Sequence, residues 1–495
     1  MDMRRLGLIA ALALAAASIV APAAAQRTDI TMGMVLEPPH LDPTAGAAAA
    51  IREVGYRNIF EGLTRIDRNG AVQPLLARDW EISDDGLVYT FHLQEGVKFH
   101  DGSPMTSADV AFSFKRAMAE DSVNAQKQLF EPIEKLETPD DHTVVITLKR
   151  PTGHFPFNLG WGDMVIVSPA SADTNKTRPI GTGPFRFAEW VPGDRIVLTR
   201  NPDYWGEPVA LERATFKIIP DPAAAVAAMM AGDVDAFANF PAPEAIPQFE
   251  ADPRFTVVIG STEGETILAI NNGRPPFDDL KVRQAIAHAI DRQAIIEGAM
   301  FGLGTPIGSH FAPHHPAYVD LTGVYPYDPA KAKALLAEAG HADGIKATLK
   351  LPPPSYARRG GEVIAEQLRQ VGIDLEIIPV EWAQWLEQVF RGKDYDLTIV
   401  SHTEPMDIEI YGRDDYYFNY HNPAFREVLD RLAAETDTQK RYALMGEAQK
   451  ILAADAVNAF LFQLAKAGVW DARLEGLWEN SPIPANDLTE VRWKE

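Results

Sequence analysis

Alternating apolar and polar positions predict eight β-strands, because successive side chains of a strand point to opposite faces. The alternation is clearest in "LVYTFHLQ" (87–94), where Tyr89, Phe91 and Leu93 share one face. The other segments with strand patterning are "TDITMGMVL" (28–36), "TVVITLK" (143–149), "DRIVLTR" (194–200), "ATFKIIP" (214–220), "ATLKLP" (347–352), "DLEIIPV" (374–380) and "YDLTIV" (395–400).

Helical periodicity with readable ends appears between many of these strands. In "YDPAKAKALLAEAG", Asp328 suits the N-cap, Pro329 the first helical position and Gly340 the end. Residues 360–380 read as a helix followed by a strand, which predicts α/β layers with a mostly parallel sheet from about 280 to 470. Further helices are expected at 278–299, 423–437 and 438–456 and in the Ala-rich stretch ending near Gly232; Val282, Ile286, Ile290 and Ile295 are assigned to the core.

The first 25 residues have the pattern of a cleaved secretory signal. Arg4 and Arg5 precede an apolar run from Leu6 to Val20 and then small residues up to Ala25. That run is shorter than the roughly 20 residues that span a bilayer. The chain has no cysteine, which excludes disulfides, thiolate catalysis, cysteine zinc sites and a lipid-accepting cysteine at the cleavage region. We expect a free exported protein in the periplasm.

Net charge and chain length limit the possible partners and the number of domains. Removing residues 1–25, whose net charge is +1, takes the formal charge of the chain from −23 to −24. Nucleic acid and anionic membrane become unsuitable partners, since both select clustered Lys and Arg. The remaining 470 residues predict two or three domains.

One stretch, residues 75–118, is more specific than any periodicity. It reads "LLARDWEISDDGLVYTFHLQEGVKFHDGSPMTSADVAFSFKRAM". Its "HDGSP" supplies turn residues, and Thr106 can cap the following helix, with Asp109 at the third helical position. The block therefore builds structure and need not touch a ligand.

The same stretch closely resembles the signature region of the family 5 solute-binding proteins of ABC importers, which bind dipeptides, oligopeptides and nickel chelates. Other segments agree in order and spacing, so the resemblance covers nearly the whole mature chain: "LDPTAG", "NIFEGLTRID", "IGTGPFRFAEWVPGDRIVLTRNPDYWG", "INNGRPPFDDLKVRQAIAHAIDR", "YDPAKAKALLAEAG" and "FNYHNPAFREVLD". It implies an α/β bilobal periplasmic binding protein of type II, with an extra subdomain and mixed sheets flanked by helices.

The resemblance also implies a domain plan. Domain I is placed at 27–64, 179–271 and 473–495, domain II at 65–178, and domain III at 272–472. Ligand would bind between domains I and III, two crossing strands near 271 and 473 would act as the hinge, and closure would be read by ABC permease subunits in the inner membrane. A monomer without cofactor or enzymatic activity is implied.

The stretch 401–420, "SHTEPMDIEIYGRDDYYFNY", is predicted to form a recognition wall. In peptide binders of the resembled family, an Asp lies three residues before an acid–Pro pair in this loop. Glu404 and Pro405 match that pair, but Ser401 occupies the earlier position. Glu404 or Asp407 is the alternative partner for a ligand ammonium group, and Arg413 for a carboxylate.

Aromatic side chains and an N-terminal loop complete the predicted ligand set. Residues 381–420 hold nine of the 45 aromatic residues, more than twice the average density, and Trp382, Trp385 and Tyr411 could stack on a ligand. Glu37 and His40 in "EPPHLDP" lie where the family usually lines its cleft.

Two other readings stay open. Nickel-chelate relatives can use one loop histidine, a place that His402 occupies, and His310, His314, His315 and His421 are further histidines for a metal reading. An opine or sugar ligand also suits the fold. A secreted hydrolase is disfavoured, because the chain has no HExxH, G-x-S-x-G or phosphate-loop motif.

Overall fold

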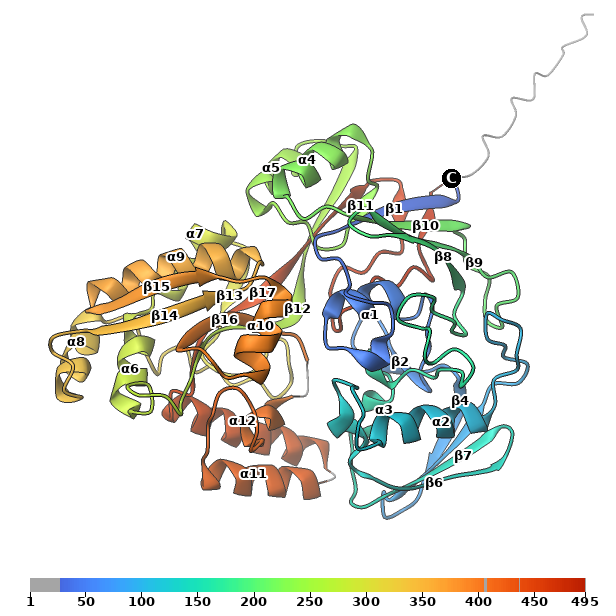
Figure 1. The fold of residues 1–495 in the computed structure, drawn as a ribbon, viewed down its shortest axis with the longest axis horizontal. Helices are drawn as coiled ribbons and strands as arrows, with labels where there is room; N and C mark the ends of the chain where they lie inside the picture. Colours follow the sequence, from blue (N-terminus) through green and yellow to red (C-terminus); the bar gives the residue numbers. More distant parts are fainter. Residues whose placement is uncertain (1–26, 405–406, 436, 495) are drawn as a thin grey trace, which may run out of the picture.

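The computed structural model describes residues 27–404, 407–435 and 437–494, so the predicted signal segment lies outside the described residues. Two lobes stand side by side (Figure 1). Lobe 1 is built from residues 27–261 and 465–494, and lobe 2 from the described residues between 265 and 463. Within the described ranges, no helix is both long and apolar enough to cross a membrane.

One large sheet continues through both lobes. Its order is β15-β14-β16-β12-β17-β11-β1-β10-β9-β8, and β13 pairs with β17. The strands are β1 (Asp29–Met34), β8 (Phe185–Val191), β9 (Arg195–Arg200), β10 (Arg213–Ile218), β11 (Ala236–Phe237), β12 (Phe255–Ile270), β13 (Gly304–Pro306), β14 (Ile345–Leu351), β15 (Ile373–Pro379), β16 (Leu397–His402) and β17 (Asn458–Asp471).

Strands β12 and β17 are the two chain segments that cross between the lobes. Their antiparallel pairing changes register between Ser261 and Glu265, which leaves residues 262–264 outside the regular ladder. On the lobe 1 side β17 also pairs with β11, and on the lobe 2 side β12 also pairs with β16. A register break of this kind locally bends the strand, and here it lies where β12 and β17 pass from one lobe to the other.

The expectation of a mostly parallel sheet over 280–470 is wrong in part. Strand β14 is parallel to β15 and β16, but β16 is antiparallel to β12, and β17 is antiparallel to both β12 and β13. The chain enters lobe 2 along β12 and returns along β17, so these neighbours must run in opposite directions. The predicted class of mixed sheets flanked by helices is confirmed.

A smaller sheet in lobe 1, with order β4-β5-β7-β6, carries the signature stretch. Tyr89, Phe91 and Leu93 are all buried on one face of β5, as predicted. The amide of Thr106 donates to Asp109 Oδ2 (2.8 Å), which confirms the predicted cap of α2. The elements are β4 (Ala77–Ile82), β5 (Val88–Leu93), β6 (Ile133–Asp140), β7 (Thr143–Leu148) and α2 (Ser107–Met118), with a separate hairpin of β2 (Thr64–Ile66) and β3 (Val72–Pro74).

Most predicted helices form where their caps indicate. Asp328 accepts from the amide of Lys331 at the start of α8, and Gly232 ends α4 in a left-handed conformation. The segment 278–299 forms two helices instead of one, because Asp291 caps a second helix. The helices are α1 (Ala49–Gly55), α3 (Phe155–Asn158), α4 (Pro222–Ala231), α5 (Ile246–Glu250), α6 (Leu280–Ala289), α7 (Arg292–Met300), α8 (Pro329–Glu338), α9 (Ser355–Gln370), α10 (Trp382–Trp385), α11 (Pro423–Ala434) and α12 (Thr438–Ala454).

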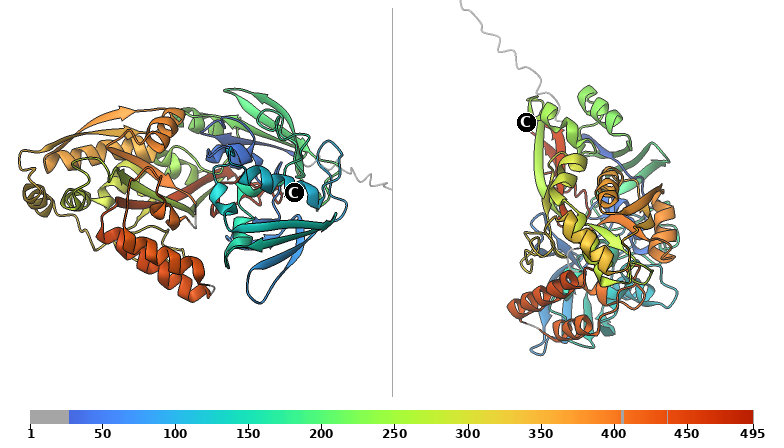
Figure 2. Two further views of the ribbon diagram at one scale, coloured as in Figure 1. Left: turned by 60° about the horizontal axis from the view of Figure 1, so that its bottom comes forward. Right: turned by 90° about the vertical axis from the view of Figure 1, so that its left-hand side faces the viewer.

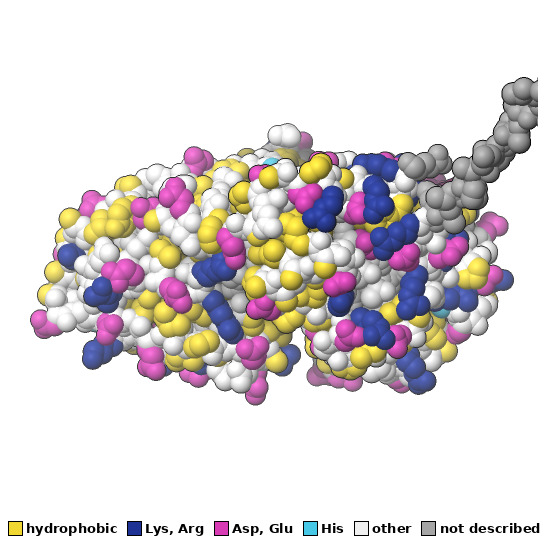
Figure 3. All heavy atoms as spheres, turned by 90° about the horizontal axis from the view of Figure 1, so that it is seen from above, with side chains coloured by type: hydrophobic (Ala, Val, Ile, Leu, Met, Phe, Trp, Pro, Cys, Tyr) yellow, Lys and Arg dark blue, Asp and Glu magenta, His cyan; other side chains and the backbone are white. Residues whose placement is uncertain are grey.

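The lobes touch through polar contacts on several sides. Arg359 of α9 pairs with Glu244 of lobe 1 (3.1 Å). Arg441 of α12 reaches His154 just before α3 (2.9 Å between Nη2 and Nδ1), and the views in Figures 1 and 2 place α11 and α12 beside this part of lobe 1. On the face shown in Figure 3, acidic and basic side chains are interspersed.

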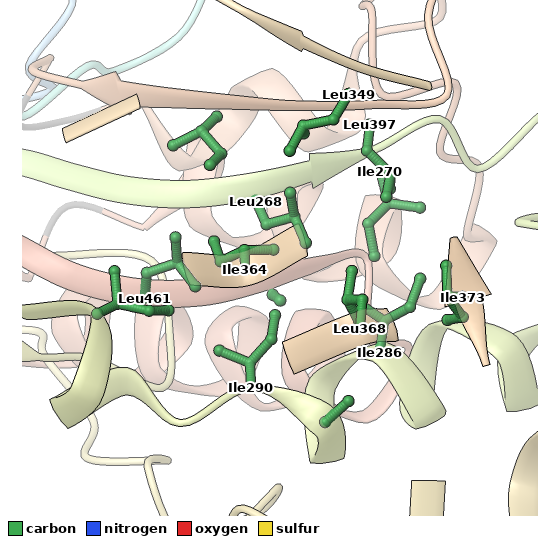
Figure 4. Close-up of a cluster of buried hydrophobic side chains, with 14 of the residues drawn as sticks. Leu268, Ile270, Ile286, Ile290, Leu349, Ile364, Leu368, Ile373, Leu397 and Leu461 are labelled. Atoms are coloured by element: carbon green, nitrogen blue, oxygen red, sulfur yellow. The ribbon is translucent and has the colours of Figure 1, made fainter. Parts of the chain in front are cut away.

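The core of lobe 2 lies between the sheet and helices α6, α7 and α9 (Figure 4). All four apolar residues assigned to it from the sequence are buried: Val282, Ile286, Ile290 and Ile295. Ile364 of α9 packs in the same cluster with no exposed surface, whereas Ile377 of β15 is 37% exposed.

Removal of one methylene at Ile364 should measurably destabilise lobe 2. Ile364→Val is expected to lower the free energy of unfolding by about 1 kcal/mol, because the close-packed core collapses only partly around the missing group. Urea unfolding measures the change. The same substitution at Ile377 is the matched control, expected within about 0.5 kcal/mol of the wild type. Equal losses in both variants would contradict this packing.

Candidate functional site

A small cavity of about 50 Å³ lies where the two lobes face each other. Lobe 1 lines it from η2 (Lys127–Phe130) and from the region of α3 that ends at Trp161. Lobe 2 lines it with Glu404, Asp407, Glu409 and Arg413, which follow β16 and include residues of η6 (Ile408–Gly412). The site therefore joins segments that are more than 200 positions apart in the sequence.

Arg52 and Asp163 form a buried ion pair on the lobe 1 side. The distance from Arg52 Nη1 to Asp163 Oδ2 is 3.0 Å, and the two side chains are 3% and 0% exposed. The Arg52 guanidinium also lies 5.6 Å from the ring centroid of Trp161. Across the lobe boundary, Glu404 Oε1 is 3.9 Å from Arg52 Nη2, so a cation of lobe 1 meets an acid of lobe 2 at the cavity.

Burial shifts the proton affinity of Asp163 upward. Desolvation raises the pKa of this carboxyl to about 6; Arg52 opposes the shift and Glu404 adds to it. The same cause raises the pKa of Glu409, which is surrounded by Arg150, Arg413 and Arg441. Asp163 and Glu409 are therefore two acids near the cavity whose charged forms are disfavoured by burial.

Asp407 is held between two histidines of lobe 2. Its Oδ1 lies 2.8 Å from His310 Nε2, and its Oδ2 lies 3.8 Å from His402 Nδ1. Burial would raise the pKa of Asp407, but His310, His402 and Arg413 outweigh burial and lower it. Burial lowers the pKa of His402, whose Nε2 is 2.8 Å from the Tyr417 hydroxyl.

Two acids of β12 lie behind this wall, next to the register change. Glu265 accepts a hydrogen bond from the amide of Phe311 (3.1 Å), and burial raises the pKa of its carboxyl well above the usual range, with Asp407, Glu263 and Glu404 adding to the shift. Glu263 Oε1 is 2.6 Å from His314 Nε2. The lobe 2 wall is therefore rich in acids from the cavity inward to the strand that connects the lobes.

The predicted site residues of the 401–413 loop are the ones that the structure brings together. Glu404, Asp407 and Arg413 line the cavity, and His402 contacts Asp407 from behind. Ser401, near the end of β16, keeps a buried hydroxyl that has no hydrogen-bond partner among the described atoms. Pro405 lies outside the described residues.

The two acids that follow Arg413 in the sequence, Asp414 and Asp415, form their ion pairs with other residues. Asp414 pairs with Arg426, and Asp415 lies 2.6 Å from Lys393, so both flanking acids have other cationic partners. Arg413 itself stacks 5.4 Å from the ring centroid of Tyr416 and contributes to the cavity wall.

The predicted aromatic residues do not line this cavity. Trp385 is 3% exposed and donates from Nε1 to the hydroxyl of Thr398 (2.9 Å), with Trp382 stacked on it at a centroid distance of 5.2 Å. Tyr411 is 2% exposed and stacks on Phe418 at 4.9 Å. Trp385 and Tyr411 thus lie in the core behind the wall, and the partly buried Trp382 packs against the same core.

Glu37 and His40 also lie outside the cavity lining. Glu37 accepts hydrogen bonds from Trp190 Nε1 and from the amide of Gly193, both at 2.9 Å, which ties its loop to the β8–β9 hairpin. His40 Nδ1 accepts from the amide of Asp42 (3.3 Å), and burial lowers the pKa of its ring.

The sequence reading missed the lobe 1 side of the site. Short helices and loops without a recognisable motif supply its residues, which are Arg52, Asp163 and Trp161. A buried ion pair also leaves no repeating pattern of residues in the sequence. Glu265 lies in no recognisable motif, so the sequence predicts no site there. His310 was considered only as one of several histidines, and its distance from Asp407 depends on the fold.

These features define the class of protein. Two lobes joined by paired crossing strands, with a cavity between them and an added small sheet, form a type II periplasmic binding protein fold. The chain belongs to family 5 of the bacterial extracellular solute-binding proteins, whose middle-region model matches residues 71–459. It is therefore a solute-binding protein, and the expected family and fold are confirmed.

Individual relatives show how varied the ligands of similar chains are. The chain is 34% identical to heme-binding protein A of Haemophilus influenzae over 66% of this chain and 65% of that protein. It is 33% identical to the glutathione-binding protein GsiB of Pectobacterium atrosepticum over 79% and 76% of the two chains. The Helicobacter pylori periplasmic binding protein DppA, solved with the peptide STSA, matches with a TM-score of 0.88 at 26% identity, over 95% and 99%.

Proposed function

We propose that this protein is the periplasmic component of an ABC importer and carries a peptide or peptide-like small molecule with a cationic group. The observation that carries the proposal is the acidic wall of lobe 2, where Glu404 and Asp407 line the cavity together. An ammonium group is the complement of such a wall, and Arg413 is available for a carboxylate at the other end of the ligand. The names of the similar glutathione- and peptide-binding proteins support this ligand class.

Closure of the lobes is the proposed mechanism. Because the cavity wall is shared, a ligand gains all its contacts only when the lobes are together, and binding therefore shifts the population toward the closed form. Bending is proposed at residues 262–264, where β12 crosses between the lobes, instead of near 271 and 473 as expected from the sequence. Permease subunits would recognise the closed shape. The domain plan with boundaries at 64, 178, 271 and 472 stays a prediction, as do monomeric state, periplasmic location and lack of catalysis.

A metal chelate is the second candidate ligand. His402, Glu404 and Asp407 offer one nitrogen and two oxygen ligand atoms within 4.8 Å of one another at the cavity. Imidazole together with carboxylate suits Ni²⁺ and similar ions. For an opine, the support is a similar structure, the binding protein AgaA solved with agropinic acid (TM-score 0.86, 26% identity). No arrangement of the described side chains favours a sugar.

A melting screen tests the proposed ligand class. Di-, tri- and oligopeptides should raise the melting temperature, since a ligand that binds only the folded form stabilises it by about 2.7 kcal/mol at 100 times Kd. Opines, sugars and nickel–histidine are screened beside them. Mass spectrometry identifies any solute that copurifies, and scattering should show compaction on binding. A shift with nickel–histidine and with no peptide would overturn the peptide proposal in favour of the chelate.

A further inference from the structure

A second group of possible metal ligands lies deeper than the cavity, in the body of lobe 2. It consists of Glu265 near the start of the lobe 2 part of β12, His310 after β13, and Asp407 after β16. One ligand atom from each of the three lies within 4.8 Å of the others. The three residues come from segments that are close only in the folded chain.

The geometry around His310 is that of an imidazole between two acids. His310 Nε2 is 2.8 Å from Asp407 Oδ1, and His310 Nδ1 is 3.7 Å from Glu265 Oε2. A tetrahedral ion with bonds near 2.0 Å needs ligand atoms about 3.3 Å apart. The two acids approach different ring nitrogens, and one ion binds only one of these nitrogens, so the carboxylate at the other nitrogen must move along the ring edge to reach the ion. Ligand atoms of all three residues already lie within 4.8 Å of one another.

Glu265 supplies an independent sign that a cation belongs here. The residue is 1% exposed, and its Oε1 accepts from the amide of Phe311. Its Oε2 is buried, faces His310, and has no hydrogen-bond partner among the described atoms. A buried carboxylate oxygen without a donor costs free energy, and a bound cation removes that cost.

We propose that Glu265, His310 and Asp407 bind a divalent transition-metal ion of the Zn²⁺ type, whichever solute the cavity carries. One imidazole nitrogen with two carboxylates suits Zn²⁺, Co²⁺ or Ni²⁺, whereas Mg²⁺ prefers an octahedron of oxygens. Three protein ligands leave a fourth position for water.

The position of the ion gives it a structural consequence. Glu265 directly follows the register change of β12, and Asp407 lines the cavity. An ion bound to both ties the strand that connects the lobes to the wall that contacts the solute. It fixes the direction of the Asp407 carboxylate, so a metal-loaded protein has a more rigid lobe 2 wall.

Titration of the full-length mature protein with metal, after treatment with a chelator, tests the proposal. Calorimetry with ZnCl₂ alone should show one site and a higher melting temperature, and MgCl₂ should show neither. His310→Gln and the isosteric Glu265→Gln should each weaken Zn²⁺ at least about tenfold. Glu263→Gln is the matched control, two positions away on β12 and paired with His314, and should bind Zn²⁺ as the wild type does.

Further measurements separate this site from the chelate candidate at the cavity. His402→Gln should weaken Zn²⁺ binding much less than His310→Gln does, because His402 contacts Asp407 but is not one of the three ligands. X-ray absorption of the unmutated Zn²⁺ form should report one imidazole and oxygen ligands near 2.0 Å, which keeps the test valid even if a variant fails to fold. No binding at millimolar ZnCl₂, or binding that survives His310→Gln and is lost in His402→Gln, overturns the proposal.

Discussion

Replacing Arg52 by methionine should lower the free energy of unfolding by about 3–5 kcal/mol at pH 8, because it leaves a carboxylate buried without its cation. Asp163 has no exposed surface, and its pair with Arg52 spans 3.0 Å. Methionine keeps most of the length of the side chain beside Trp161, so the loss of charge dominates the change. Urea unfolding of the two proteins measures it.

The loss should depend on pH in a defined direction. Burial raises the pKa of Asp163 from 3.8 in the unfolded chain to about 6 in the folded one. The contribution of Asp163 to the free energy of unfolding is therefore fully present below pH 3.8, and it is lost as the pH rises through 6. The Arg52→Met variant should lose less at pH 5, where Asp163 is largely protonated, than at pH 8.

A double variant provides the control for this prediction. Arg52→Met combined with Asp163→Asn removes both charges and should recover much of the stability lost in the single variant. If the double variant is as unstable as Arg52→Met at pH 8, the loss comes from packing and not from an unpaired carboxylate. A loss that is the same at pH 5 and pH 8 would lead to the same conclusion.

Neutralising Glu404 and Asp407 together should weaken a cationic ligand by about 100-fold or more. Removing the acidic partner of a desolvated cation at a binding surface costs about 2–5 kcal/mol, and both acids line the same cavity. Calorimetry of the Glu404→Gln, Asp407→Asn variant, with a ligand found by the melting screen, measures the change. Chelator is present throughout, so that metal bound at Asp407 does not contribute.

Two acids of the same loop serve as matched controls. Asp414→Asn and Asp415→Asn remove the same charge at side chains that are 83% and 93% exposed and paired with Arg426 and Lys393. They should leave the affinity unchanged, because exposed pairs are screened by water and salt. Glu404→Gln alone should account for part of the loss, since Glu404 is not among the three proposed metal ligands. Unchanged affinity in the double variant would remove both acids from the ligand site.

The fold was largely predictable because its signals are local. The caps at Thr106 and Asp328 and the alternation in β5 depend on residues a few positions apart. The relative direction of neighbouring strands could not be predicted in this way, because it depends on residues far apart in the sequence. The pairing of β12 with β17 joins residues about 200 positions apart, and nothing in either segment says that its neighbour runs the opposite way.

The candidate site was likewise predictable only where its signal is local. The loop after β16 was identified from its unusual density of acids and rings, and it does supply Glu404, Asp407 and Arg413 to the cavity. The same density of aromatic residues does not show which rings line the cavity and which are buried in the core. Tyr411 and Trp385 lie in the core because their rings are packed by helices and strands from elsewhere in lobe 2.

By itself, the sequence determined that this is a cysteine-free, acidic α/β protein with the signature of a solute-binding family, since composition, capping and alternation are properties of neighbouring residues. Only the tertiary structure decided which charges meet. Arg52 faces Glu404 across the lobes, and His310 joins Glu265 to Asp407 inside one lobe. Electrostatic interactions depend on distance in space and on burial, and both are set only when distant segments pack together.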